Sequence, residues 1–365
     1  MSDKVKNLSL IAIFMSCIVG VFFVNLILKD ETVSSSERRK LTQFPNVSYS
    51  NIMNGSFMDQ FNDYAVDQFI LRDDFRSIKS LIEFKVFGKK DNNNLYVLNN
   101  SIYKIEDKIK TEEIKNAADK FNDIYEKYLT GMNVYFSLIP DKSHYVESDA
   151  FYPSIDYNEV QNIMKSSLKN MTYIDIYDTL YINSYYRTDT HWKQEKLDGV
   201  VEKISKEMDF NKYLNSTYSK KQIKDFYGVY YGQLALKTEP DTITYYTNDI
   251  IQDCTVYNYE TGKYADVYDM TKLSSMDKYD IFLSGATPLL RIDNPNCDTG
   301  KKLIVFRDSY GSSIIPFFIE AYEEIIIVDI RYIASSLLEQ YIEFEDQDVL
   351  FLYSALVLGN SSILK

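Results

Sequence analysis

Histidine, tryptophan and cysteine are scarce in this chain of 365 residues, which has two histidines, one tryptophan and three cysteines. A catalytic zinc site with three histidine ligands is therefore excluded, and a zinc site of four cysteines is one ligand short. The sequence predicts no bound metal and no cofactor. A nucleophile that needs a histidine base must use His144 or His191, because the chain has no other histidine.

Positive charge is also in short supply. Lysine and arginine total 40 against 53 aspartates and glutamates, a formal net charge of -13 at pH 7. Such a chain lacks the basic face that binds a phosphate backbone and has no general attraction to anionic lipid, so we predict no nucleic-acid partner. Its composition, 45% hydrophobic and 25% charged, is that of a globular protein with one large domain or two smaller ones.

The chain has one long hydrophobic run near its start. Residues 8–28 carry no charge, and at 1.5 Å per residue they span the ~30 Å hydrocarbon core of a bilayer. A cleaved signal peptide has a shorter apolar stretch and a small-residue cleavage site, so we favour an uncleaved transmembrane anchor at 1–29 with a short cytoplasmic tail. We expect a single-pass protein of the cell membrane whose main domain is extracytoplasmic. There, Cys254 and Cys297 either form a disulfide or remain separate thiols.

An N-terminal segment, residues 30–104, follows the predicted anchor. Residues 30–56 are polar and rich in serine and asparagine, which predicts a stalk with little regular structure. Apolar residues at helical spacing predict one or two amphipathic helices in 57–86. Residues 96–104 have the pattern of a β-hairpin with two asparagines at its tip.

The main domain is predicted at residues 105–365, where strand-like apolar runs alternate with helical patterns. The predicted strands are 134–139, 173–176, 303–306, 325–330 and 349–353. The predicted helices are 111–129, 157–169, 193–208, 312–323 and 333–341. This alternation is typical of an α/β fold, a parallel sheet with helices on both faces. Residues 225–265, rich in tyrosine and threonine, interrupt it and predict an inserted antiparallel β segment.

Ser309 lies between the apolar strand 303–306 and the helix that is predicted to follow. A serine at such a turn is at the carboxyl end of a parallel strand, where open α/β sheets bind ligands. Backbone N–H groups at the start of the helix can stabilise an oxyanion there. The alternative is that Asp308 or Ser309 only caps the helix.

Residues 187–192 combine an arginine, an aspartate, a histidine and the single tryptophan. Asp189 and His191 are two positions apart in a loop and can point toward one site. Asp189 would then orient His191, and His191 would take the proton of Ser309. The alternative is an ordinary surface loop. His144, which also follows a predicted strand, is the competing base.

Several segments together resemble the DHHW family, relatives of the alginate O-acetylation proteins with SGNH-hydrolase-like domains. The segments are SSSERRKLTQFP, NGSFMDQFNDYAVDQFILRDDF, LIPDKSHY, RTDTHW, YDIFLSG, FRDSYGSS, VDIRY and VLFLY. Asp189 and His191 match the Asp-x-His motif of the alginate relatives, in the same order before the serine. The chain departs from the family at Thr190, where the name motif has its first histidine, and at Arg307, where a glycine usually precedes the Asp-Ser pair.

The resemblance implies an SGNH-hydrolase-like, flavodoxin-like sheet and O-acetyl transfer onto an exopolysaccharide or cell-surface glycan. Ser309 would carry the acetyl group with His191 as base and Asp189 orienting it, and a multi-spanning membrane acyltransferase would deliver the acetyl donor. Candidate oxyanion or substrate-binding residues are Tyr310, Tyr353, Arg187, Arg307 and Trp192. The alternative for Arg187, Arg307 and also Arg331 is a structural ion pair with Asp308 or Asp329.

Two other functions stay open on the sequence. A carbohydrate acetyl esterase of the same fold would use water in place of the sugar hydroxyl. A non-catalytic polysaccharide-binding assembly subunit would have the same fold without the catalytic activity. The missing glycine before Asp308 and Ser309 is consistent with this hypothesis.

Overall fold

The computed structural model describes residues 3–34, 36–146 and 152–365, so Ser35 of the predicted stalk lies outside the described residues. Contacts divide the chain into a first unit, Met1–Asn93 with Tyr231–Lys237, and a second unit, Asn94–Tyr230 with Thr238–Lys365. The predicted hairpin therefore falls in the second unit and not in the N-terminal segment. It is held there because the Ile102 N–H donates to the Arg187 carbonyl at 2.8 Å.

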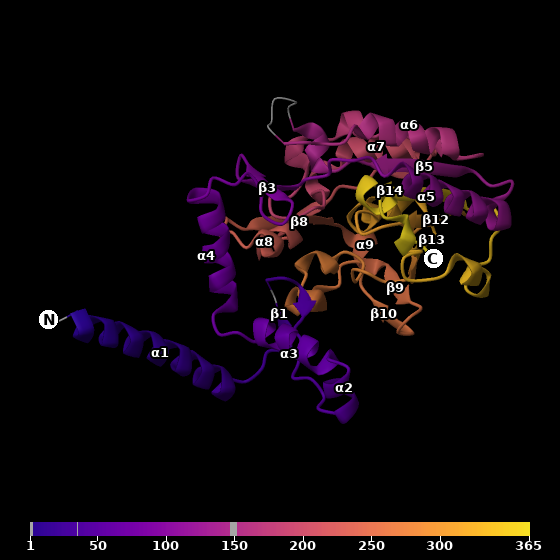
Figure 1. Ribbon diagram of the computed structural model, residues 1–365. Helices are drawn as coiled ribbons and strands as arrows, with labels where there is room; N and C mark the ends of the chain where they lie inside the picture. The colour runs from indigo at the N-terminus through magenta and orange to yellow at the C-terminus, as the bar shows by residue number, and fades with distance from the viewer. Residues whose placement is uncertain (1–2, 35, 147–151) are drawn as a thin grey trace. The chain divides into compact units, whose positions relative to one another are not determined.

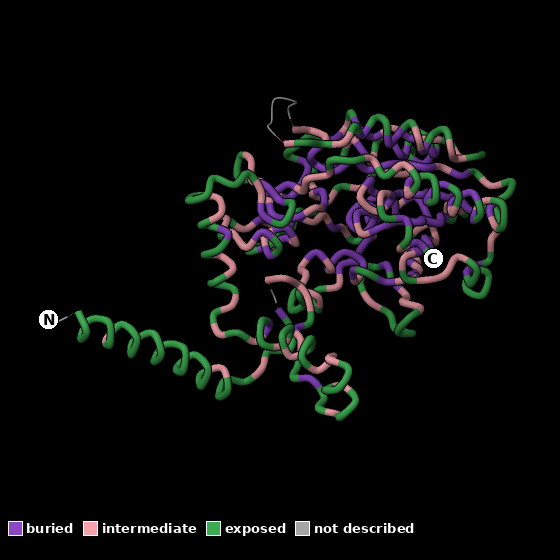
Figure 2. The backbone as a smooth tube through the Cα atoms, viewed as in Figure 1, coloured by how far each residue is buried: buried purple, intermediate pink, exposed green. Residues whose placement is uncertain are grey.

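The first unit begins with α1 (Asp3–Ile27), which has no buried residue along its length (Figures 1 and 2). Among the helices that the structure describes, α1 alone is long and apolar enough to cross a membrane. The other elements of this unit are β1 (Val33–Ser34), β2 (Arg39–Lys40), α2 (Tyr49–Met53), α3 (Ser56–Asp67) and α4 (Arg72–Lys85). The prediction of one or two amphipathic helices within 57–86 is thus confirmed, with two helices, α3 and α4.

The second unit is built on an eight-stranded sheet with the order β10-β9-β11-β13-β12-β14-β5-β6. Its strands are β5 (Val134–Ile139), β6 (Thr172–Tyr173), β9 (Thr255–Asn258), β10 (Lys263–Ala265), β11 (Leu289–Asp293), β12 (Lys302–Arg307), β13 (Glu324–Val328) and β14 (Asp348–Ser354). The run from β13 to β6 is parallel, whereas β11, β9 and β10 add antiparallel strands at one edge. A pair of antiparallel strands, β3 (Leu95–Leu98) and β4 (Ser101–Lys104), forms the predicted hairpin.

Helices cover both faces of the sheet, as the alternating sequence pattern predicts. Apolar side chains alternate along β12 and β14, so that Val305 and Leu350 enter one core and Ile304 and Phe351 the other. The first core is completed by α7 (Asp198–Glu207), α9 (Asp249–Asp253) and α10 (Gly311–Ile314). The second is completed by α5 (Thr111–Ile124), α6 (Tyr157–Ser167) and α11 (Ala355–Leu358).

The prediction of a separate antiparallel insertion at 225–265 is wrong in part. β7 (Ser219–Phe226) and β8 (Asp241–Thr247) do pair apart from the main sheet, but β9 and β10 belong to the main sheet. They join it because β9 pairs with β11, a strand that the alternating pattern does not reveal. The segment at 229–234, with its strand-like tyrosines, is the helix α8 (Val229–Leu234).

Two predicted helices are shorter than their sequence patterns. The helix predicted at 312–323 is α10 followed by 3-10 turns at Ile315–Phe317 and Ile319–Ala321. Pro316 lacks the N–H that a continuous α-helix needs at this point. The helix predicted at 333–341 is a 3-10 helix at Ser335–Gln340.

Candidate active site

Ser309 occupies the sharp turn between β12 and α10. β12 lies between β13 and β14 and is parallel to both, so the turn is at the carboxyl edge of the sheet. Asp308 fixes the turn, because one of its carboxylate oxygens accepts the Tyr310 N–H at 3.0 Å and the other accepts the Ser354 N–H at 2.8 Å. The aspartate before the serine is therefore a structural brace between two neighbouring strands.

Asp189 and His191 lie in a tight loop that is closed by a hydrogen bond from the Tyr186 N–H to the His191 carbonyl at 3.1 Å. One oxygen of Asp189 is 2.6 Å from His191 Nδ1 and also accepts the His191 backbone N–H at 3.0 Å. The other oxygen accepts the Val229 N–H at 2.7 Å. Because a carboxylate can only accept, Nδ1 carries the proton and Nε2 is left with a lone pair.

The His191 ring bridges the two loops. Its Nε2 is 2.7 Å from Ser309 Oγ, within hydrogen-bond distance. Asp189 is fully buried and His191 nearly so, whereas Ser309 is partly exposed. A neutral imidazole held in this way can accept the hydroxyl proton of Ser309 and so generate a nucleophile.

Aromatic side chains hold the imidazole in place. The Tyr279 ring stacks on His191 with 4.0 Å between ring centroids and 9° between planes. Its hydroxyl donates to Ser313 Oγ at 2.8 Å, and burial raises the pKa of Tyr279 well above its ordinary value. Tyr279 is a site residue that the sequence did not single out, although it begins one of the segments that resemble the DHHW family.

Trp192 and Tyr310 join the histidine loop to the serine turn. The Trp192 indole N–H donates to the Tyr310 carbonyl at 3.0 Å and to Ser313 Oγ at 2.9 Å, and the indole is fully buried. In return, the Tyr310 hydroxyl donates to the Thr190 carbonyl at 2.7 Å. Both side chains, proposed from the sequence as substrate-binding candidates, are engaged inside the protein.

The groups predicted to stabilise an oxyanion differ in whether their hydrogen-bond donor is free. The Tyr310 backbone N–H already donates to Asp308, so it is not free for an oxyanion. Within the described ranges the Ser309 N–H has no acceptor, which leaves it as the available backbone donor. The Tyr353 hydroxyl is buried and has no hydrogen-bond partner in the part of the chain that the structure describes, and its ring packs 4.9 Å from that of Phe121 on the α5 side of the sheet.

The arginine candidates form structural interactions. Arg187 contacts Asp241 through Nε at 3.4 Å and donates to the Pro240 carbonyl at 2.7 Å. Arg307 is fully buried, pairs with Asp329 at 3.3 Å and donates to the Gly285 carbonyl at 3.2 Å.

Asp329 is shared between two arginines. It also accepts two hydrogen bonds from Arg331, at 2.8 and 2.6 Å. The ion-pair alternative for Arg307 and Arg331 is therefore what the structure shows, with Asp329 as the partner.

His144 lies in an aromatic environment. Its ring contacts those of Tyr145, Tyr157 and Tyr177, and burial lowers its pKa. In the part of the chain that the structure describes, no serine or carboxylate is hydrogen-bonded to the ring. The structure thus brings Ser309 to His191 and not to the competing histidine.

Lys142 supports the loop that carries Asp189 and His191, and it was not identified from the sequence. This fully buried ammonium group donates to the carbonyls of Tyr186 at 2.9 Å, Arg187 at 3.3 Å and Asp189 at 2.7 Å. Burial lowers the pKa of Lys142 to about 8. The signal that sequence reasoning lacked was burial, because a lysine in a loop is normally exposed.

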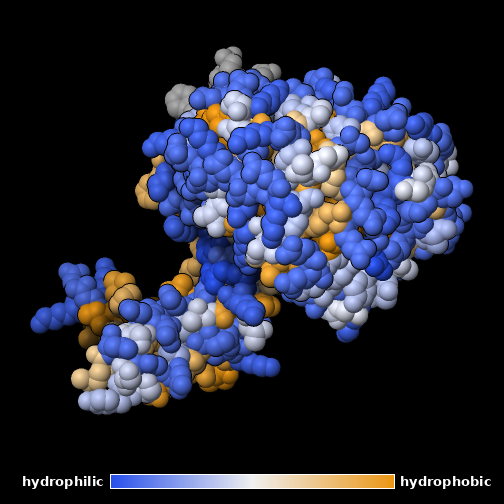
Figure 3. Space-filling view, turned by 90° about the vertical axis from the view of Figure 1, so that its right-hand side faces the viewer, coloured by the Kyte–Doolittle hydropathy of each residue, from blue (hydrophilic) through white to orange (hydrophobic). Residues whose placement is uncertain are grey.

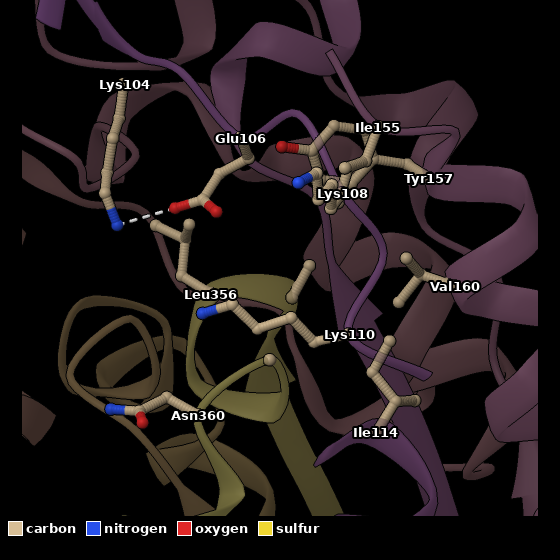
Figure 4. Close-up of a pocket in the computed structure, with 12 residues that line it drawn as sticks. Lys104, Glu106, Lys108, Lys110, Ile114, Ile155, Tyr157, Val160, Leu356 and Asn360 are labelled. Atoms are coloured by element: carbon tan, nitrogen blue, oxygen red, sulfur yellow. Dashed lines mark ion pairs between the residues drawn. The ribbon is translucent and has the colours of Figure 1, made fainter. Parts of the chain in front are cut away.

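A cavity of about 270 Å³ opens near the same edge of the sheet (Figure 4). Lys104, Glu106, Lys108 and Lys110 line one side, with Lys104 and Glu106 paired at 2.6 Å. Ala355 lines the other side and directly follows Ser354, whose N–H donates to Asp308. The cavity therefore lies one strand away from the serine turn, on the α5 and α6 side of the sheet.

These features define the fold as SGNH-hydrolase-like: a mostly parallel sheet with helices on both faces and a serine at a strand-to-helix turn. The sequence profile of the DHHW protein family matches residues 90–328, and the chain belongs to this family.

Solved structures agree with this assignment. A DHHW family protein from Eubacterium siraeum is 22% identical, with a TM-score of 0.60 over 75% of this chain and 95% of its own. PatB1 of Bacillus cereus is 19% identical, with a TM-score of 0.58 over 72% of this chain and 96% of its own, and it has also been solved with a sulfonyl adduct. The O-acetyltransferase domain of Pseudomonas putida AlgJ is 11% identical, with a TM-score of 0.43 over 73% of this chain and 92% of its own. At these identities the likeness to the first two structures shows the fold. Among curated proteins, none is significantly similar to the chain.

Proposed function

We propose that this protein is a membrane-anchored, extracytoplasmic O-acetyltransferase that acetylates an exopolysaccharide or cell-surface glycan through Ser309. The observation that carries the proposal is the continuous relay from Asp189 through His191 to Ser309, with contacts of 2.6 and 2.7 Å. The acetyl-transfer reaction is proposed from membership of the DHHW family and from the resemblance of that family to the alginate O-acetylation proteins.

The first half-reaction loads the acetyl group onto the enzyme. Ser309 Oγ attacks the carbonyl carbon of the acetyl donor while its proton passes to His191 Nε2. The Ser309 N–H is the backbone donor for the resulting oxyanion. The intermediate collapses, the bond to the donor's leaving group breaks, and that group takes the proton from His191. The product is acetyl-Ser309.

The second half-reaction transfers the acetyl group to the glycan. A sugar hydroxyl gives its proton to His191 Nε2 and attacks the acetyl carbon, the bond to Ser309 Oγ breaks, and the serine recovers the proton from His191. Asp189 holds the imidazole in the same tautomer during both steps and stabilises its cationic form. An esterase would follow the same course with water as the acceptor.

The acceptor and the donor are proposed to have separate sources. The lysine-lined cavity shown in Figure 4 is the proposed seat for sugar residues beyond the reacting hydroxyl, since it shares the carboxyl edge of the sheet with Ser309. The donor is proposed to come from a multi-spanning membrane acyltransferase beside the α1 anchor.

The proposal is tested with the full-length protein in detergent and p-nitrophenyl acetate as donor. Ser309→Ala is expected to abolish acetyl release. Ser312→Ala serves as the matched control, because Ser312 is a buried serine of α10 whose hydroxyl has no hydrogen-bond partner among the described residues. Equal rates for the wild type and Ser309→Ala would overturn the assignment. If polysaccharide oligomers stay unmodified while acetate accumulates, the protein is an esterase and not a transferase.

A further inference from the structure

Helix α4 turns a polar side toward the interior of the first unit and an apolar side outward. One side of the helix points into the first unit: Arg72 and Arg76 both pair with Glu37, at 2.5 and 3.0 Å, and Ser80 is fully buried. Arg76 also donates to the Gly232 carbonyl at 2.8 Å. The interior side of this helix is therefore built from ion pairs and hydrogen bonds.

The apolar residues of α4 point outward. We call the apolar face of α4 the set Phe75, Ile78, Leu81, Ile82 and Val86, the last of which caps the helix. Their exposed fractions run from 39% to 70%. Their spacing places them along one side of the helix, opposite the ion-paired residues. In a water-soluble protein, such an apolar side of a helix is buried. The exposed apolar face of α4 therefore requires an apolar environment.

The apolar face of α4 is continuous with the side of α1. Phe75, Phe69 and Phe61 line a hollow of about 1120 Å³ whose other wall is the second half of α1, with Val21 and Phe22 among its residues. Apolar atoms dominate both walls, and Figure 3 shows apolar surface on this part of the molecule. Lipid chains around α1 therefore have direct access to the start of the α4 face.

Hydrogen bonds fix this arrangement at the outer end of α1. The Asn25 side chain accepts the Ile70 N–H at 3.0 Å, just before α4 begins. The Tyr64 hydroxyl donates to Asp30 at 3.1 Å, and the Glu31 N–H donates to Gln68 at 2.9 Å. The beginning of α4 is thus tied to the level at which α1 would leave the hydrocarbon.

The ends of α4 carry charges at the same side as its apolar face. Asp74 lies in its first turn and Lys85 in its last, and both are exposed. Figure 1 shows α4 running across the direction of α1 and not alongside it. An amphipathic helix with charged ends that lies across a spanning helix is the arrangement of a helix in the membrane interface.

We propose that the apolar face of α4 lies in the outer interface of the bilayer that α1 crosses, with lipid acyl chains covering it. The inference rests on the membrane anchor in the proposed function and adds a second contact with the bilayer. The first unit is then held at two places, by α1 through the bilayer and by α4 on its surface.

The experiment uses the full-length chain in phosphatidylcholine–phosphatidylglycerol vesicles, with the three native cysteines replaced by alanine and one spin label per variant. Labels at Ile78 and Ile82 report on the apolar face of α4. A label at Val19 reports on α1, and a label at Asp63, an exposed position of α3 turned away from the hollow, is the water-facing control. Collisions with oxygen indicate lipid, and collisions with a water-soluble nickel chelate indicate water.

The proposal expects labels at Ile78, Ile82 and Val19 to collide more with oxygen, and the label at Asp63 to collide more with the nickel chelate. If Val19 reports lipid but Ile78 and Ile82 report water, the α4 proposal is wrong and the anchor stands. If neither reagent reaches Ile78 and Ile82, protein covers the face and the lipid assignment is wrong. Water at Val19 overturns the anchor and the α4 contact together. The same collision measurements are repeated in a Ser309→Ala variant, so that their result does not depend on the acyl-transfer reaction.

Discussion

Replacing Lys142 with methionine removes a buried ammonium group while keeping most of the side-chain volume. The Lys142 Nζ donates to the carbonyls of Asp189 and Tyr186 at 2.7 and 2.9 Å, and more weakly to that of Arg187 at 3.3 Å. The Arg187 carbonyl keeps the N–H of Ile102 at 2.8 Å. The substitution therefore removes two strong hydrogen bonds from the loop that carries Asp189 and His191.

Two opposing terms set the expected loss of stability. A hydrogen bond from a charged donor contributes about 1.5–3 kcal/mol, so two contribute about 3–6 kcal/mol. Burial lowers the pKa of Lys142 from 10.5 to about 8, and this difference corresponds to about 3 kcal/mol of unfavourable charge burial that methionine avoids. We expect Lys142→Met to reduce the free energy of unfolding by at most about 3 kcal/mol.

Activity is expected to suffer more than stability. When the Asp189 carbonyl loses its ammonium partner, the loop shifts and His191 moves relative to Ser309. A misplacement of about 1 Å costs about 10²-fold, so we expect kcat for p-nitrophenyl acetate to fall about 10–100-fold with little change in KM.

The assay combines acetyl release with urea unfolding of the full-length protein in detergent. Lys115→Met, an exposed lysine of α5, is the control and is expected to change neither quantity. An unchanged kcat in Lys142→Met would refute the reasoning, as would a rise in KM without a loss of kcat.

Three further predictions follow from the same geometry. Asp189→Asn leaves the His191 Nδ1 proton without its carboxylate and favours the wrong tautomer, so kcat should fall about 10²–10⁴-fold while the melting temperature changes little. Gly285→Ala should lower the free energy of unfolding by about 1–3 kcal/mol in a urea titration, because Gly285 has a φ of +78° and an added Cβ would lie 2.2 Å from Asp280. Burial lowers the pKa of His144 below its ordinary 6.5, so the unfolded chain binds the proton more readily and wild-type stability should fall as the pH drops below about 6.5. His144→Phe should show a smaller fall between pH 7.5 and 5.5, and an identical fall would contradict the burial argument.

The parallel half of the sheet could be predicted from the sequence because its strands are short apolar runs buried on both faces. β5, β12 and β14 lie where these runs predict them, within a residue or two. The antiparallel edge could not be predicted, since β11 and β9 are short and only their pairing in three dimensions makes them strands. At α8, tyrosine and valine favour a strand locally, but the segment 229–234 folds as a helix.

The loops of the candidate site could be found from the sequence because their residues are rare in this chain. Two histidines and one tryptophan leave few ways to build a base, and the structure brings His191 and Ser309 within 2.7 Å. The supporting residues could not be found in this way. Tyr279 is one of 32 tyrosines and Lys142 belongs to a lysine-rich chain, so only their burial and contacts distinguish them.

The most direct test of the central claim is to locate the acetyl group on the enzyme. The full-length protein is incubated with p-nitrophenyl acetate, quenched in acid and digested, and the peptides are mapped by mass spectrometry. The account predicts acetylation at Ser309 in the wild type and none at this position in His191→Ala. Acetyl release without any acetyl-Ser309, or equal acetylation of Ser309 in His191→Ala, would contradict it.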